Sequence, residues 1–488
     1  MSSARPRPRS RWRPVRPSGP PSPPGPRRWP WPRRSPSSRR SPVPRRGRGG
    51  PHPAQLTIVG FAAGVLIGTG LLMLPSAHRG AGSATVLEAL FTATSALCVT
   101  GLIVVDTPVY WSGLGQVVIL VLIQVGGFGI MALASLLGVL VTRRLGLRQQ
   151  LTAAAETKTL RLGDVRTILL GVVRTSLVVE GVTALVLAAR FALGYGEPVP
   201  RALWLGLFHS VSAFNNAGFA LFSDNLVGFA TDAWICLPIA AAVVIGGLGF
   251  PVLFELRRHH RHPARWSLHT KITVLGTAVL LAAGTAFMLV TEWRSPATLG
   301  PLSTPDKLLV GFFQGVMPRT AGFNSVDIAA MNTGTWLGSD ILMFIGGGSA
   351  GTAGGIKITT FLVLLFVIAS EARGDDAATA FGRTLPRALQ RQALSVALLG
   401  VAAVVIPSVV FALTTPFTLD QILYEVTSAF ATVGLSTGIT AQLPVPHQLV
   451  LVALMFIGRT GTITLAAALA LRSRPRLYQL PEERTIVG

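Results

Sequence analysis

Long apolar segments alternate along the chain with shorter segments of mixed polarity. The apolar segments are near or above the roughly 20 residues that an α-helix needs to cross the hydrocarbon core of a bilayer. Eight of them cover residues 56–74, 113–141, 165–193, 233–256, 271–291, 337–369, 391–415 and 447–471. The pattern therefore predicts eight transmembrane helices.

Between the members of each successive pair lies a shorter, semi-polar segment. These segments are too short and too polar to span, so we expect helices that enter the membrane and return, enclosed by protein or water. They cover residues 84–97, 201–214, 306–318 and 420–431. The fold predicted is an all-α membrane protein of four membrane–pore–membrane repeats, with eight transmembrane helices and four re-entrant pore helices around one central pore.

The four short segments resemble one another. Three or four residues after the end of each stands a glycine followed by a large apolar residue, and an aromatic residue lies ten positions before that glycine. The glycines are Gly101, Gly218, Gly322 and Gly434, and the aromatic residues are Phe91, Phe208, Phe312 and Tyr424. A second glycine follows each by 24 to 28 residues, at Gly126, Gly246, Gly346 and Gly458. Such repeats predict four similar units around one axis.

This recurrence indicates a chemistry. A short helix can point its partly negative C-terminal end at the membrane centre, and extended backbone after it can present carbonyl oxygens in place of a cation's water shell. Glycine allows the close approach that this needs. Helix packing alone explains a single glycine but not four with a shared context, so the sequence favours a pore for a monovalent cation.

Charge adds orientation. Only 13% of residues are charged, against about 25% in soluble domains. Residues 1–50 hold 15 Arg and no acid; without them, 28 basic residues face 20 acidic ones and the net charge falls from +23 to +8. Basic residues otherwise gather in 142–166, 257–271, 370–392 and after 471, which predicts that both termini are cytoplasmic in a multi-pass cell-membrane protein.

The N-terminal tail is rich in Arg, Pro and Ser and cannot bury a core, so we expect it to be disordered. Binding of anionic lipid or nucleic acid is open to such a tail, but an unstructured extension is the simpler interpretation, and no nucleic-acid partner is expected. The predicted organisation is a tail at 1–54, repeats at 55–142, 143–257, 258–370 with a broken helix, and 371–472, and a second cytoplasmic tail at 473–488.

Residues 346–355 read GGGSAGTAGG, with six glycines in ten positions. A helix should break there, and broken backbone at membrane depth normally lines a water-filled cavity. We expect a mobile polar loop in the pore; a glycine-lined packing face is the alternative. The match to G-x-G-x-x-G is rejected as a dinucleotide site because its flanks are apolar spans and no βαβ unit surrounds it.

Arg459 lies within the last span, where a buried arginine points to function. For Arg319, Arg174 and Glu180 the simpler expectation is structural pairing with an opposite charge. Cys98 and Cys236 offer neither a disulfide framework nor a metal pair. No H-E-x-x-H, Walker A or nucleophile–base arrangement is present, so we expect no enzyme.

Several stretches together resemble the Trk/Ktr/HKT superfamily of potassium transporters, and most closely the membrane subunit of bacterial Ktr systems. They are SALCVTGLIVVDT (95–107), SAFNNAGF (212–219), PRTAGFNSVD (318–327), GGGSAGTAGGIKITTF (346–361), EVTSAFATVGLSTG (425–438) and FIGRTG (456–461). The resemblance extends over about residues 56–471.

The resemblance implies a selectivity filter that binds K⁺, with one glycine per repeat and potassium favoured over sodium alone. The implied filter residues are Cys98, Val99, Thr100, Gly101, Asn215, Asn216, Ala217, Gly218, Arg319, Thr320, Ala321, Gly322, Ala431, Thr432, Val433 and Gly434. It also implies a gate below the filter, formed by Gly346, Gly347, Gly348, Ser349, Gly351, Thr352, Gly354, Gly355, Lys357 and Arg459.

The resemblance further implies a homodimer with one pore per subunit and a separate cytosolic ring that binds nucleotide and controls the gate. The transported ion is K⁺, with Na⁺ left open, and no cofactor is expected in this chain; ion-coupled symport stays open beside passive uptake. Membrane lipid is the other expected partner. The alternative function is the potassium-binding subunit of an ATP-driven pump, which shares the pore architecture.

Overall fold

The computed structural model describes residues 53–80, 82–144 and 162–471. The two predicted tails lie outside these residues except at Pro53 and Ala54, where α1 begins. The helices are α1 Pro53–Leu72, α2 Val86–Leu97, α3 Thr107–Tyr110, α4 Gly113–Arg144, α6 Leu162–Gly194, α7 Val199–Phe214, α8 Ala233–Leu248, α9 Phe250–His259, α10 Leu268–Glu292, α11 Thr304–Val316, α12 Thr333–Phe344, α13 Ile358–Arg373, α14 Arg387–Thr414, α15 Leu419–Ala431 and α16 Val445–Leu471. The described part is helical as predicted.

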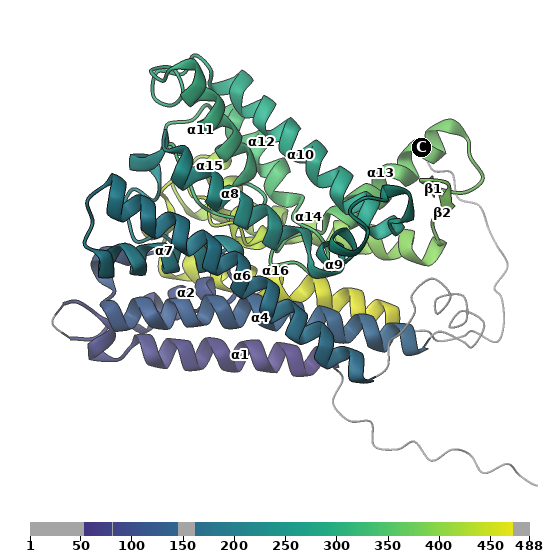
Figure 1. The fold of residues 1–488 in the computed structure, drawn as a ribbon, viewed down its shortest axis with the longest axis horizontal. Coiled ribbons are helices and arrows are strands. Elements are labelled where there is room, and N and C mark those ends of the chain that lie inside the picture. Colours follow the sequence, from purple (N-terminus) through teal and green to yellow (C-terminus); the bar gives the residue numbers. More distant parts are fainter. Residues whose placement is uncertain (1–52, 81, 145–161, 472–488) are drawn as a thin grey trace, which may run out of the picture. The chain divides into compact units, whose positions relative to one another are not determined.

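The helices pack in four groups, each with one of the predicted short helices inside it (Figure 1). α2 lies between α1 and α4, α7 between α6 and α8, and α15 between α14 and α16, while α11 packs on α10 beside α12 and α13. Each group contacts the next: α4 touches α6 and α7, α8 touches α11, α12 touches α15, and α16 returns to α2. The contacts therefore run in a closed cycle around the four short helices.

The N-terminal ends of three of the four short helices, α2, α11 and α15, are fixed by capping side chains, whereas α7 begins after Pro198 without one. Thr85 and Glu88 form a reciprocal capping box at α2, in which Thr85 N donates to Glu88 Oε2 (2.9 Å) and Glu88 N donates to Thr85 Oγ1 (3.3 Å). Ser303 caps α11, and its hydroxyl also contacts the Asp306 carboxylate (2.6 Å). Such caps satisfy amides that a helix of 12 or 13 residues would otherwise leave free.

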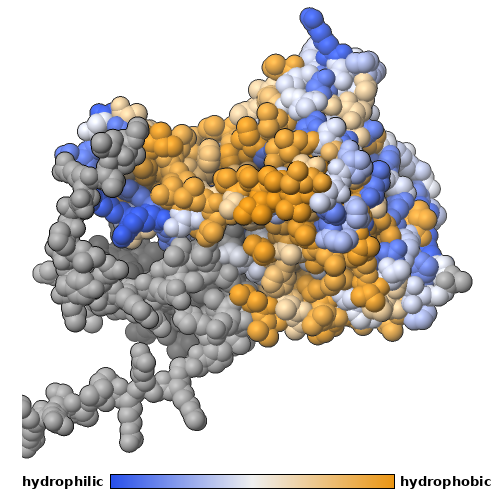
Figure 2. Space-filling model, turned by 180° about the vertical axis from the view of Figure 1, so that it is seen from behind, coloured by the Kyte–Doolittle hydropathy of each residue, from blue (hydrophilic) through white to orange (hydrophobic). Residues whose placement is uncertain are grey.

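The outer faces of the helices are strongly apolar. Side chains with more than 60% of their surface exposed include Leu66, Ile67, Leu185, Val290 and Ile406. Figure 2 shows such residues merging into a broad hydrophobic surface. A surface of this size is out of place in water and suits the hydrocarbon core of a bilayer.

By length and composition, three helices of the described part could each cross a membrane alone. They are α10, α14 and the part of α6 from Leu169 to Gly194. The bent pair α8–α9 would make a fourth. The other predicted spans coincide with α1, α4, α16 and the broken pair α12–α13, whose described apolar portions are shorter. The eight predicted spans thus all have a helical counterpart, but only some satisfy the length criterion by themselves.

Two local features were not predicted. The apolar segment 233–256 forms two helices, because the chain bends by 100° between α8 and α9. Gly249 at the bend has a φ of 91°, and Pro251 follows it. The predicted loop 370–392 contains a small hairpin, in which β1 Thr379–Ala380 pairs antiparallel with β2 Arg383–Thr384.

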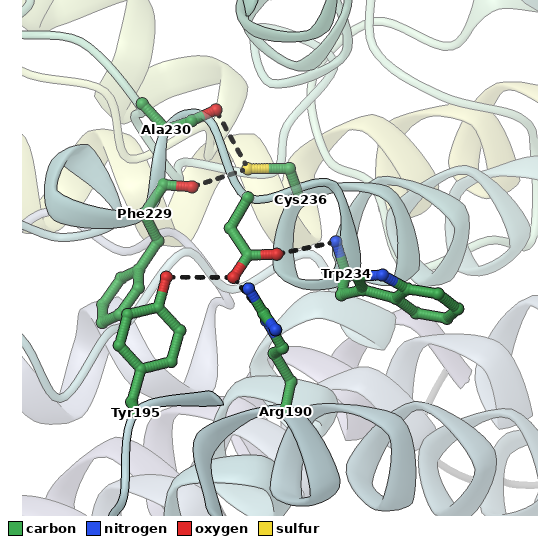
Figure 3. Close-up of polar contacts among 7 residues, drawn as sticks. Arg190, Tyr195, Phe229, Ala230, Trp234 and Cys236 are labelled. Carbon is green, nitrogen blue, oxygen red and sulfur yellow. Dashed lines mark hydrogen bonds and ion pairs between the residues drawn. The ribbon is translucent and has the colours of Figure 1, made fainter. Parts of the chain in front are cut away.

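A polar cluster joins the end of α6 to the start of α8 (Figure 3). Asp232, the N-cap of α8, accepts hydrogen bonds from Trp234 N (2.9 Å) and Tyr195 Oη (2.9 Å) and forms an ion pair with Arg190 (2.7 Å). The Cys236 thiol donates to the Phe229 carbonyl at 3.4 Å. These bonds fix the loop between the two helices, so Asp232 serves the fold.

Candidate functional site

The four short helices end in similar turns that carry all the predicted filter residues. The residue two positions before each predicted glycine has a left-handed backbone, with φ between 52° and 64°: Val99, Asn216, Thr320 and Thr432. The glycines themselves have φ between 69° and 96°. Left-handed conformations are uncommon for side chains other than glycine, so their recurrence at one position shows that four distant segments adopt one backbone path.

The four glycines meet one another. A Cβ atom on Gly101 would collide with the Ala217 carbonyl, one on Gly218 with Ala321, one on Gly322 with Val433, and one on Gly434 with Thr100. Each of these carbonyls belongs to the residue just before the next glycine. The segments therefore close into a ring, which we call the glycine ring, in which each carbonyl lies against the neighbouring glycine and a side chain has no room.

Serine side chains brace the ring from behind. Ser95 Oγ accepts from Gly101 N (3.1 Å), and Ser428 Oγ accepts from Gly434 N (3.0 Å). In the second segment Ser212 Oγ donates to Phe219 O (2.8 Å). The sequence analysis missed these residues, although a Ser-Ala pair six residues before three of the four glycines is a visible signal.

The second glycine series has a structural role in three of its four members. A Cβ on Gly126, Gly246 or Gly458 would collide with the carbonyl at the end of the neighbouring short helix, at Leu97, Phe214 and Phe430 respectively. Gly346 instead lies against Gly354 of its own segment. The third group therefore departs from the others at the point where its second helix breaks.

The break predicted at 346–355 is present, since α12 ends at Phe344 and α13 begins at Ile358. The segment folds back on itself through Gly346 N, which donates to Ile356 O (2.8 Å). It also lies on the bend between α8 and α9: Gly348 N donates to Gly247 O (2.8 Å). We call residues 346–355 the inner segment.

The inner segment contacts the turns that carry the ring. Thr352 Oγ1 donates to Asn216 Oδ1 (2.8 Å) in the second turn, and a Cβ on Gly354 would collide with Thr432 Oγ1 in the fourth. The predicted filter and gate residues are therefore neighbours.

Three cationic side chains donate to backbone carbonyls of the inner segment. The Arg459 guanidinium bonds to Thr352 O, Lys357 Nζ to Ala353 O (2.5 Å) and Arg319 Nη2 to Gly346 O (3.5 Å). Arg459 and Arg319 are 2% and 6% exposed, so their charge is held inside the protein. Carbonyls that a broken helix leaves without amide partners are suitable acceptors for these groups.

Structural pairing with an opposite charge is not found for Arg319, Arg174 or Glu180 among the ion pairs of the described residues, and the Arg174 side chain is exposed. Glu180 instead accepts from Gln124 Nε2 at 3.1 Å and from Asn215 Nδ2 at 3.3 Å. Among the side chains that are described, no group of three His, Cys, Asp or Glu residues could hold a metal ion.

Comparisons with known proteins agree on one family. A profile of the TrkH family, described as cation transport protein, matches residues 52–475. The Ktr system potassium uptake protein B of Bacillus subtilis is 38% identical over 86% of this chain and 93% of its own, and that of Vibrio alginolyticus is 36% identical over 87% and 93%. The potassium/sodium uptake protein NtpJ of Enterococcus hirae is 34% identical over 89% and 97%.

A solved structure supports the fold. The crystal structure of the potassium transporter TrkH from Vibrio parahaemolyticus matches 86% of this chain and 85% of its own with a TM-score of 0.63, at 20% sequence identity. At that identity the likeness concerns the fold alone.

Proposed function

Because this chain belongs to the TrkH family of cation transport proteins, which are multi-pass membrane proteins and not enzymes, we propose that it takes up potassium through one pore formed by its four similar helix groups. These groups are the membrane–pore–membrane repeats predicted from the sequence, and α2, α7, α11 and α15 are their pore helices. The printed names of its relatives mention potassium uptake or potassium/sodium uptake. They support K⁺ as the main transported ion and Na⁺ as the second candidate.

The observation that carries this proposal is the glycine ring. Four carbonyls lie in one ring, each against a neighbouring glycine where no side chain fits, and such oxygens can replace the hydration shell of a monovalent cation. The hydroxyl oxygens of Thr100, Thr320 and Thr432 are buried beside it without a hydrogen-bond partner. Buried polar atoms rarely stay unsatisfied, so these oxygens suit a site that an ion and its waters occupy. We therefore propose that the predicted filter residues bind the ion at the glycine ring.

The inner segment is proposed as the gate. It contacts three of the four ring turns, at Asn216, Arg319 and Thr432. The side chains of Arg459, Lys357 and Arg319 donate to its carbonyls. A positive charge in a low-dielectric path also repels a permeating cation more than it would in water. Withdrawal of the segment, with its cations, would open the path and remove that repulsion.

Regulation and assembly complete the proposal. The Ktr system names of the relatives support a separate partner subunit, which we propose to be a cytosolic nucleotide-binding ring. We also propose a homodimer with cytoplasmic termini, in contact with membrane lipid. An ATP-driven pump subunit is not favoured, since the family model describes cation transport proteins and the most similar relatives are named as potassium uptake proteins.

The test is rescue of a bacterial strain that lacks potassium uptake, with and without a candidate partner subunit. Growth at low K⁺ is expected from the full chain and from Gly70→Ser, because a Cβ at Gly70 meets nothing within 4 Å. Gly434→Ser places a side chain against the Thr100 carbonyl and should abolish the rescue at low K⁺. Failure of the full chain, or equal rescue by both variants when both reach the membrane, would overturn the proposal.

A further inference from the structure

In three of the four ring turns, a side chain of the short helix holds the backbone just beyond the ring glycine. The amide three residues after the glycine donates to that side chain in each case: Leu221 N to His209 Nε2 (3.2 Å), Ser325 N to Gln314 Oε1 (3.4 Å) and Thr437 N to Glu425 Oε1 (2.9 Å). The same bond recurs in three segments about one repeat apart. An imidazole, a carboxamide and a carboxyl group therefore hold the same backbone position in the three turns.

Two of these bracing groups carry no charge in the observed geometry. His209 Nδ1 lies 2.8 Å from the Leu205 carbonyl, which can only accept, while Nε2 faces the Leu221 amide, which can only donate. The imidazole of His209 therefore has its proton on Nδ1 and a lone pair on Nε2, which is the neutral form. Gln314 is neutral by its chemistry.

Glu425 differs because donors surround both of its oxygens. Oε1 accepts from Ser436 Oγ (2.5 Å) as well as Thr437 N, and Oε2 accepts from Thr440 Oγ1 (2.8 Å). The side chain is fully buried, and the ion pairs of the described residues do not include it. These contacts are compatible with the ionised carboxylate, which can only accept, although the two hydroxyls could also accept from a protonated carboxyl. The negative charge behind this ring turn is therefore part of the proposal that follows.

We propose that Glu425 is a specificity-determining residue that positions the outer end of the fourth ring turn and supplies the fixed negative charge that balances a cation in the ring. The proposal rests on the proposed function. A buried charge requires compensation, and a permeating cation next to the turn provides it. The charge lowers the K⁺ concentration needed for transport, and the braced backbone keeps the carbonyl spacing that separates K⁺ from the smaller Na⁺.

The chain contains a matched control for Glu425. Glu292, at the end of α10, is also fully buried and accepts from Asn332 N (2.9 Å), Thr335 Oγ1 (2.5 Å) and Thr298 Oγ1 (2.6 Å). Its partners include no ring turn. Neutralising Glu292 therefore removes a buried, hydrogen-bonded carboxylate without changing the charge behind the ring.

The test compares Glu425→Gln and Glu292→Gln in the purified full chain, reconstituted in liposomes with an imposed K⁺ gradient. Glu425→Gln should raise the half-saturating K⁺ concentration about 10-fold, the order expected for one charge at short range in a protein, and lower the K⁺/Na⁺ flux ratio. Glu292→Gln should lower the melting temperature without either change. Values within twofold of wild type for folded Glu425→Gln would overturn the proposal, as would equal shifts in both variants.

Moving the charge gives a second, independent measurement. Gln314→Glu places a carboxylate behind the third ring turn, so it should lower the half-saturating K⁺ concentration several-fold in the wild-type chain and restore it in Glu425→Gln. This variant decides the question if Glu425→Gln does not fold, since an unchanged value would contradict the role of charge. Gly101→Ser separates the two proposals: if it changes the flux ratio and the carboxylate variants do not, only this inference fails.

Discussion

The glycine ring and the inner segment are neighbours built on opposite plans. The ring uses the same turn four times, with the same left-handed residue and the same glycine in each. The inner segment occurs in one group alone, and Gly346 there departs from the packing of Gly126, Gly246 and Gly458. If the proposed function holds, the difference means that four equivalent turns select the ion, whereas a segment present in one helix group obstructs the pore.

Breaking the ring should have the largest effect. Gly101→Ser introduces a Cβ against the Ala217 carbonyl at a φ of 94°, so one turn must move and its carbonyl with it. A shift of about 1.4 kcal/mol in relative ion binding changes a ratio tenfold, and we expect the K⁺/Na⁺ flux ratio in liposomes to fall by about that factor. An unchanged ratio in folded protein would remove the ring from ion selection.

Shortening the inner segment should raise flux without changing selectivity. Deletion of residues 349–351 removes the Ala350 carbonyl that accepts from Phe250 N (3.4 Å) and the Ser349 hydroxyl that contacts Thr359 Oγ1 (3.0 Å). We expect about a fivefold rise in K⁺ flux per folded protein, with weaker control by the partner, because the obstruction no longer reaches the ring. Wild-type flux and wild-type regulation would show that the segment is no gate.

Neutralising the charge that joins the two regions should have a smaller effect. Arg459→Gln removes the guanidinium that donates to Thr352 O, so the segment is held less firmly and the local positive charge disappears. We expect about a threefold rise in maximal flux, with the melting temperature nearly kept. Flux and melting temperature are measured on the same preparation; lower stability with unchanged flux would identify Arg459 as a structural residue.

A change remote from both regions should affect stability alone. Asp232→Asn weakens the ion pair with Arg190, whose side chain is 39% exposed, so water screens much of that interaction and the loss of folding stability is small. A fall of a few degrees in melting temperature is expected, with flux and K⁺/Na⁺ ratio unchanged. An altered K⁺/Na⁺ ratio would show that the polar cluster of Figure 3 also influences ion selection.

Most of the fold follows from patterns that a single segment carries. Apolar length, the semi-polar short helices and the recurring glycines predicted the helical groups, and the six glycines at 346–355 predicted the break. The residues of the four ring turns could also be predicted from the sequence, because each turn repeats the same local sequence features. Roles in selection and gating stay predictions, as do the domain limits.

Contacts between distant segments could not be predicted. Among the described residues, Arg319 donates to a backbone carbonyl of the inner segment and not to a carboxylate. Glu180 accepts from side-chain amides of Gln124 in α4 and Asn215 at the end of α7, and not from a cationic side chain. These partners become neighbours only when the helix groups pack. The bend at Gly249 was missed for a different reason: one glycine and one proline within an apolar run do not show whether the helix will break or continue.

The closed order of contacts in the glycine ring has a consequence for biosynthesis. Gly434 lies against Thr100, a residue that leaves the ribosome long before the last helix group exists. The first three ring turns can meet while the chain is still being made, but the ring can close only when the fourth turn exists, and contacts of such long sequence separation form slowly. Until then the first and third turns each lack one neighbour, which makes closure of the ring one of the last steps in the folding of this protein.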